Sequence, residues 1–135
     1  AVADSVTEDN LSQAIAFAKA FAQKTGSVIA ITGAIDIVAD AKNAYCIYNG
    51  HPMMSSITGT GCQLSAMAAA FVTANPDTPL KAVTAAVCAM GICGEKAYGR
   101  LTKADGNSSY RNYIIDAIYH LDGEELERCA KYQLY

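Results

Sequence analysis

Residues 27–32, "SVIAIT", form a short run of β-branched and small apolar side chains without polar alternation. A run of this kind predicts a strand that is covered on both faces of a sheet. Apolar residues recur at helical spacing just before it, at Leu11, Ala14, Ile15, Ala18, Phe21 and Ala22. A helix followed by a covered strand is typical of the α/β class, so α/β is the predicted fold.

The ends of this first helix are also marked in the sequence. Ser5 and Glu8 have the spacing of a capping box at its start. Lys24 near the end and Gly26 just beyond it indicate the C-terminus.

A hairpin is predicted directly after the strand. Residues 34–40, "AIDIVAD", alternate in polarity, and residues 43–49, "NAYCIYN", read as a second strand, with turn-forming residues between them. We expect this hairpin at the edge of the sheet. Asp36 and Asp40 could attract a metal, but exposed hairpin carboxylates more often keep an edge soluble.

Four more helices are predicted beyond the hairpin. One runs from Cys62 to about Thr73, and a deeply buried one spans Ala82 to Tyr98, with Thr78 as its cap and Pro79 at its first position. Two closing helices cover "YRNYIIDAIYHL" and "GEELERCAKY". A sheet of about three strands offers too little surface for about five helices to pack against. Because the first residue is also not Met, we expect a preceding half of the domain.

Composition excludes several classes of function. The 135 residues suit one domain, and 52% apolar against 17% charged residues predict a packed core. The net charge of -3 gives no reason to expect a nucleic-acid partner, and the apolar stretches are too short to span a bilayer. Five cysteines without zinc-site spacing favour the reduced cytoplasm over a disulfide framework or structural zinc.

The segment "TGTGC", residues 58–62, places a cysteine in the first turn of an alanine-rich helix. The first N–H groups of a helix lack intrahelical partners and, with the macrodipole, attract anions, most often phosphate. A thiolate forms more easily there, so Cys62 could exchange a proton during phosphoryl transfer. Alternatively, the loop is an ordinary tight turn and Cys62 a small core residue. No lysine follows, so the segment is not a Walker A loop.

Two further residues carry open alternatives. Thr32 ends the first strand and could donate its hydroxyl to a phosphate, or simply terminate the strand. A cysteine hydrolase would pair Cys62 with a histidine such as His51. That reading lacks an orienting third group, and His51 could instead shape the turn before Pro52.

Three segments together resemble the hydroxyethylthiazole kinase family of the ribokinase-like superfamily: "ITGAID", "GHPMM" and "ITGTGCQLSAMAAAF". The resemblance runs along essentially the whole chain but matches only the C-terminal half of the family's protein. It implies a ribokinase-like layered sheet flanked by helices, with residues 1–135 as the C-terminal half of one domain. Related sugar kinases carry an aspartate where this family has the cysteine.

The resemblance also implies a reaction and its residues. It implies ATP-dependent phosphorylation of the primary alcohol of 4-methyl-5-(2-hydroxyethyl)thiazole in thiamine biosynthesis or salvage. Cys62 would be the catalytic base, the N–H groups of Thr60, Gly61 and Cys62 the anion hole, Gly59 a substrate contact and Thr32 an ATP contact.

Cofactors and partners follow from the same resemblance. It implies ATP and Mg²⁺, a small-molecule thiazole alcohol and a homotrimer with sites between subunits. Because the family's metal ligands fall in its other half, no metal ligand is assigned here. The chain departs from the family's pattern at Ala34, at Asn49–Gly50 and at residues 105–108, none of which involves Cys62. The alternative is a truncated member that binds a nucleotide or partner without catalysis.

Overall fold

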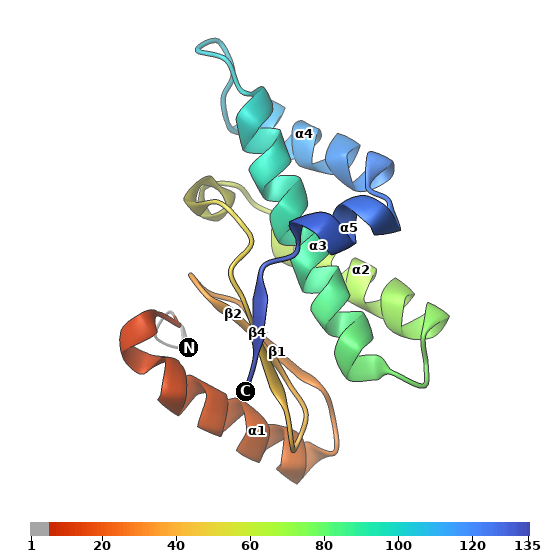
Figure 1. Ribbon diagram of the computed structural model, residues 1–135. Coiled ribbons are helices and arrows are strands. Elements are labelled where there is room, and N and C mark those ends of the chain that lie inside the picture. Colours follow the sequence, from red (N-terminus) through yellow and green to blue (C-terminus); the bar gives the residue numbers. More distant parts are fainter. Residues whose placement is uncertain (1–5) are drawn as a thin grey trace.

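Helix α1 (Leu11–Thr25) and helix α3 (Pro79–Arg100) lie on opposite faces of one antiparallel sheet (Figure 1). This computed structural model describes residues 6–135. Helices α2 (Thr60–Ala74), α4 (Asn107–His120) and α5 (Gly123–Cys129) gather around α3 on the side away from α1. The layered arrangement of sheet and flanking helices confirms the predicted α/β class.

The first helix forms where its apolar spacing predicts it. Gly26 closes it in the left-handed conformation, with φ of 69°, and donates its N–H to the carbonyl of Ala22 at 2.8 Å. A 3-10 turn, η1 (Glu8–Asn10), precedes the helix, and Asn10 Oδ1 accepts the N–H of Thr7 at 2.9 Å. Ser5 of the predicted capping box lies outside the described residues.

The sheet has the order β1 (Ile29–Ile31), β2 (Asp36–Ala39), β3 (Ala44–Ile47) and β4 (Tyr132–Leu134), and every neighbouring pair is antiparallel. The β2–β3 hairpin is confirmed. Asp40 Oδ1 closes its turn by accepting the N–H groups of Lys42 and Asn43, both at 2.7 Å.

Three expectations about the sheet are wrong. Strand β1 lies at the edge of the four described strands with Ala30 exposed, so it is not covered on both faces. The hairpin lies in the middle of the sheet rather than at its edge. The last predicted helix ends at Cys129, and the chain continues as β4 against β3. Local periodicity does not encode which strands are neighbours, since that depends on pairing between distant segments.

Both faces of the β2–β3 hairpin are buried. Ile37 and Ala39 face α1, whereas Val38 packs with Val87 and Ile92 of α3. All of these side chains are at most 2% exposed. Successive side chains of β2 therefore do point to opposite faces of the sheet, but a helix covers each of these faces.

Helix α3 is the central support of the fold, as its apolar sequence predicts. It begins at Pro79 after Thr78 and buries a continuous stretch of its length. Its Gly91 packs against the chain after β3, where a Cβ atom would lie 2.6 Å from the Cβ and 2.7 Å from the carbonyl carbon of Asn49. Tyr110 of α4 donates its hydroxyl to the carbonyl of Gly94 at 3.1 Å. Among residues 6–135, no helix has the length and apolar character needed to cross a bilayer.

A polar cluster fixes the chain after β3. Asn49, only 7% exposed, donates to the carbonyl of Cys129 at 3.0 Å and accepts the N–H of Lys131 at 2.7 Å. Glu95 of α3 accepts the N–H of Gly50 at 2.9 Å and pairs with the Lys131 ammonium at 3.2 Å. Because buried polar groups need partners, this cluster holds residues 49–50 in one position.

Candidate functional site

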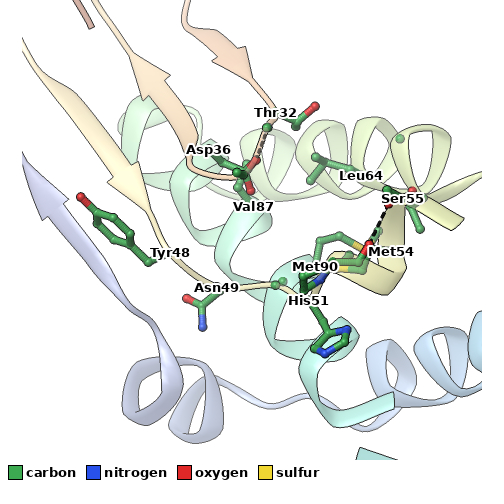
Figure 2. Close-up of a pocket in the computed structure, with 17 residues that line it drawn as sticks. Thr32, Asp36, Tyr48, Asn49, His51, Met54, Ser55, Leu64, Val87 and Met90 are labelled. Carbon is green, nitrogen blue, oxygen red and sulfur yellow. Dashed lines mark hydrogen bonds between the residues drawn. The ribbon is translucent and has the colours of Figure 1, made fainter. Parts of the chain in front are cut away.

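A cavity of about 570 Å³ opens where β1 ends and β2 begins (Figure 2). Its walls come from the loop after β1, the chain after β3 with the 3-10 turn η2 (Pro52–Ser56), the first turn of α2, and α3. The side chains that define its polar and apolar sides are Thr32, Asp36, Ser55, Thr60, Leu64 and Met90. A concave site of this size, with few polar groups among apolar ones, suits a small-molecule ligand.

The structure brings three of the sequence-predicted residues together. Thr32, Thr60 and Gly61 all line this cavity, although they come from segments almost thirty positions apart. Gly59 and Cys62 flank the Thr60–Gly61 pair along the chain but do not line the cavity. The predicted phosphate contacts thus share one space, and the predicted base lies next to it.

The first turn of α2 offers free N–H groups, as the sequence predicts. Gly59 precedes the helix with φ of 99°, and its carbonyl accepts the N–H of Gln63 at 3.0 Å. Within residues 6–135 no side chain caps this end, so the N–H groups of Thr60, Gly61 and Cys62 remain available to a ligand. They point, with the positive end of the helix dipole, toward the start of α2.

Cys62 is exposed, which contradicts the alternative that it is a small core residue. The other four cysteines are buried or half-buried. Burial raises the pKa of the Cys88 and Cys93 thiols to about 11, so both remain protonated at neutral pH. Cys62 is therefore the most accessible thiol of the described residues.

His51 shapes its own turn instead of pairing with Cys62. Its Nδ1 accepts the N–H of Met53 at 3.2 Å at the start of η2, and its ring stacks on Tyr98 with centroids 3.5 Å apart. No hydrogen bond joins it to Cys62 within the described chain. The structure thus supports the turn-shaping role over the nucleophile–base pair of a cysteine hydrolase.

The prediction that Asp36 is an exposed edge carboxylate is wrong. Instead of facing solvent at an edge, it lines the cavity, and its Oδ1 accepts the N–H of Gly33 at 2.8 Å (Figure 2). Burial raises the pKa of its carboxyl to about 6, against a smaller opposite effect of the Gly33 hydrogen bond. The sequence held one signal for this position. Asp36 lies two residues before Val38 in the strand, and this spacing places both side chains on the face that α3 covers.

Arg111 on α4 is a second residue that the sequence did not reveal. A Cβ atom at Gly59 would lie 3.7 Å from its Nη2, so the guanidinium packs beside the glycine loop. Arg111 forms no ion pair with any carboxylate of the described residues. Its position depends on how α4 packs across α3, and no local motif encodes that packing.

The residues present do not form a metal site by themselves. Within residues 6–135, no group of three His, Cys, Asp or Glu side chains is arranged to hold a metal ion. Asp36 is the sole carboxylate among the described side chains that line the cavity, and one of its oxygens is engaged by Gly33. Octahedral Mg²⁺ sites usually draw on one or two free carboxylates besides phosphates and water. By themselves, the described residues of this cavity therefore do not complete a Mg²⁺ site.

The fold and the cavity define a layered α/β protein with a small-molecule cavity at the end of its sheet. The first turn of α2, which follows Gly59, forms part of the cavity wall. The model of the hydroxyethylthiazole kinase family matches residues 3–124. The chain belongs to the hydroxyethylthiazole kinase family, and the predicted resemblance is confirmed.

Individual relatives agree with this assignment. A hydroxyethylthiazole kinase of Clostridium acetobutylicum is 62% identical over 134 residues, which are 99% of this chain and 49% of the relative. One from Zea mays is 42% identical over 111 residues, 82% of this chain and 39% of the relative. The solved structure of hydroxyethylthiazole kinase from Pyrococcus horikoshii OT3 superposes with a TM-score of 0.84 at 32% identity, covering 95% of this chain and 48% of that one. The chain thus spans about half the length of the relatives it matches.

Replacing Gly59 by Ala should destabilise the start of α2. The left-handed conformation costs a residue with a Cβ about 1–2 kcal/mol, whereas the added methyl group would make only ordinary van der Waals contact with Arg111. We expect the free energy of unfolding to fall by about that amount in denaturant titrations of the full-length protein. Gly61→Ala is the matched control, because nothing lies within 4 Å of its Cβ position and its φ is not positive. Equal losses in both variants would contradict this account.

Proposed function

We propose that the full-length protein transfers the γ-phosphate of ATP to the primary alcohol of hydroxyethylthiazole in thiamine biosynthesis or salvage. The observation that carries the proposal is the meeting of Thr32 with Thr60 and Gly61 at one cavity, in a chain of the hydroxyethylthiazole kinase family. We propose further that residues 1–135 form the C-terminal half of a single ribokinase-like domain. Its match to about half of each relative supports this reading.

The start of α2 is the proposed anion hole. The uncapped N–H groups of Thr60, Gly61 and Cys62 would donate to the oxygens of the γ-phosphate as negative charge develops there. Thr32, which lines the same cavity from the loop after β1, would contact the nucleotide. These fixed donors need no reorganisation during the reaction, which is the main way a protein accelerates phosphoryl transfer.

Cys62 is the proposed base. The exposed sulfur of Cys62 would accept the proton of the substrate hydroxyl while the hydroxyl oxygen attacks the γ-phosphorus and the bond to ADP breaks. Gly59, next to the anion hole, is the proposed contact of the thiazole alcohol. The absence of a Cβ there lets a substrate approach the backbone closely.

Other properties of the whole protein also remain proposals from family membership. They are the use of Mg²⁺ together with ATP, a homotrimer with active sites between subunits, and a cytoplasmic location without nucleic-acid or membrane partners.

The test is an ADP-release assay on the full-length protein, with and without hydroxyethylthiazole, over a range of Mg²⁺ concentrations. We expect ADP release to depend on the thiazole alcohol. Absence of thiazole-dependent turnover at every Mg²⁺ concentration would contradict the proposed function. Nucleotide binding without turnover would instead favour the non-catalytic alternative.

Arg111→Ala should weaken ATP use. Removing a guanidinium beside the anion hole takes away attraction for phosphate, and we expect the KM for ATP to rise about tenfold, which corresponds to about 1.4 kcal/mol. Because the interaction is exposed, the effect should shrink as salt rises from about 0.05 M to about 0.5 M. Arg128→Ala on α5 is the control, since it removes another exposed arginine, one that pairs with Glu125. A KM unchanged in Arg111→Ala at low salt would remove Arg111 from the site.

A further inference from the structure

The turn at the end of β1 is held by two opposite contacts. On one side Asp36 Oδ1 accepts the N–H of Gly33 at 2.8 Å. On the other side Val6 packs so closely that a Cβ at Gly33 would lie 2.9 Å from its backbone nitrogen, and Val6 accepts the N–H of Ile35 at 3.1 Å. The backbone next to Thr32 is therefore fixed between residue 6 and the carboxyl of Asp36.

Asp36 faces a nearly uncharged surrounding. From α3, the buried Cys88 thiol faces it, and the Asp36 charge is one of the causes that raise the Cys88 pKa. Strand β3 pairs Asp36 with the apolar Ile47, and the loop after β1 offers Thr32 and Gly33. Leu64 of α2 and Val87 of α3 complete this part of the cavity (Figure 2). Among the described residues, no cation offsets the charge of this carboxylate.

We propose that Asp36 is a positioning residue of this cavity, which holds the Thr32–Gly33 turn through its carboxyl oxygen and tunes nucleotide affinity through its own charge. The inference rests on the proposed function, because it takes the phosphate chain of a nucleotide as the occupant near Thr32, Thr60 and Gly61. Two opposite effects follow. The hydrogen bond to Gly33 favours binding by fixing Thr32, and the negative charge opposes binding by repelling phosphate.

The two effects separate in a pair of substitutions. Asp36→Asn removes the charge but keeps an oxygen that can accept from Gly33, whereas Asp36→Ala removes both. At pH 7.5 we expect Asp36→Ala to bind ADP at least tenfold more weakly than Asp36→Asn, measured by isothermal titration calorimetry on the full-length protein. Equal affinities within twofold would overturn the positioning role.

Asp40 supplies a matched control at the other end of the same strand. Its Oδ1 also closes a turn, by accepting the N–H groups of Lys42 and Asn43, but it does not line this cavity. The same bonds hold the pKa of its carboxyl below the ordinary range. Asp40→Ala should change the dissociation constant of ADP by less than twofold. A loss equal to that of Asp36→Ala would attribute the effect to general loosening of the hairpin and overturn the proposal.

The charge effect has its own test, which remains decisive even if Asp36→Ala does not fold. Asp36 gains its proton as the pH falls through about 6, so the repulsion of phosphate then disappears. Between pH 7.5 and pH 5.5, the ADP affinity of the wild type should improve at least threefold relative to Asp36→Asn. Titration of ADP itself affects both proteins equally and cancels in this ratio. An identical pH dependence in the two proteins would overturn the proposed effect of the charge.

These experiments read out binding, so they separate the two proposals. If the protein binds ADP with the expected differences but does not phosphorylate hydroxyethylthiazole, the proposed function fails and the role of Asp36 stands. If activity is present and the Asp36 variants bind ADP like the wild type at both pH values, the role of Asp36 fails alone. Absence of ADP binding at every pH would overturn both.

Discussion

Cys62→Ala should lower kcat by about a hundredfold or more while leaving the KM values for ATP and the thiazole alcohol nearly unchanged. The reason is that a positioned general base typically contributes a factor of about 10² to 10⁴ to the chemical step and little to ground-state binding. The exposed thiol in the first turn of α2 is available for this role, and its small side chain makes no core contact whose loss would disturb folding. Steady-state kinetics on the full-length protein would measure both constants.

Cys62→Asp provides the chemical control for this prediction. Because a carboxylate at this position can also accept a proton, we expect this variant to keep much more activity than Cys62→Ala. Cys62→Ser, which preserves size but lacks a comparable base, should behave like Cys62→Ala. Full activity in Cys62→Ala would show that Cys62 is not the base, and the anion hole would then have to account for the rate by itself.

Gly91→Ala should cause the largest loss of stability among single methyl additions to α3. The new Cβ would overlap the side chain and backbone of Asn49, and neither can move freely, because Asn49 is buried and bonded to Cys129 and Lys131. Overpacking a well-packed core typically costs about 1–3 kcal/mol, and occasionally more. We expect the melting temperature, followed by far-ultraviolet circular dichroism, to fall by several degrees or the protein to be recovered unfolded.

Gly99→Ala on the same helix is the control for this prediction. Nothing lies within 4 Å of a Cβ at Gly99, which is exposed near the end of α3. Alanine favours the helix over glycine by about 0.5–1 kcal/mol, so this variant should be slightly more stable than the wild type. If Gly91→Ala were as stable as Gly99→Ala, the close packing of residue 49 on α3 would be wrong.

The sequence predicts where the helices and strands lie along the chain better than it predicts which strands pair with each other. Helices α1 and α3 are predicted well because caps and apolar spacing are local signals, as Gly26, Thr78 and Pro79 illustrate. The edge position of β1 and the existence of β4 were not predicted. Both depend on which strands pair, and the partner of Tyr132–Leu134 is a strand far away in the sequence.

The same division applies to the site. Thr32, Thr60 and Gly61 could be selected from sequence because strand ends and helix starts are general ligand positions. Asp36 was predicted to be a solubilising edge residue, since the sequence did not show that α3 covers its face. Arg111 carries no local signal at all, because its position beside Gly59 follows from the packing of α4.

The hydrogen bonds between Asn49 and the chain at Cys129–Lys131 also suggest an order in which parts of the cavity wall form during folding. The bond from the Lys131 N–H to Asn49 joins residues 82 positions apart in the sequence. Closing so long a loop costs entropy that is recovered only after the intervening helices have packed. We expect this bond to form only once β4 has paired with β3, so the wall at residues 49–52 should gain its last support late in folding.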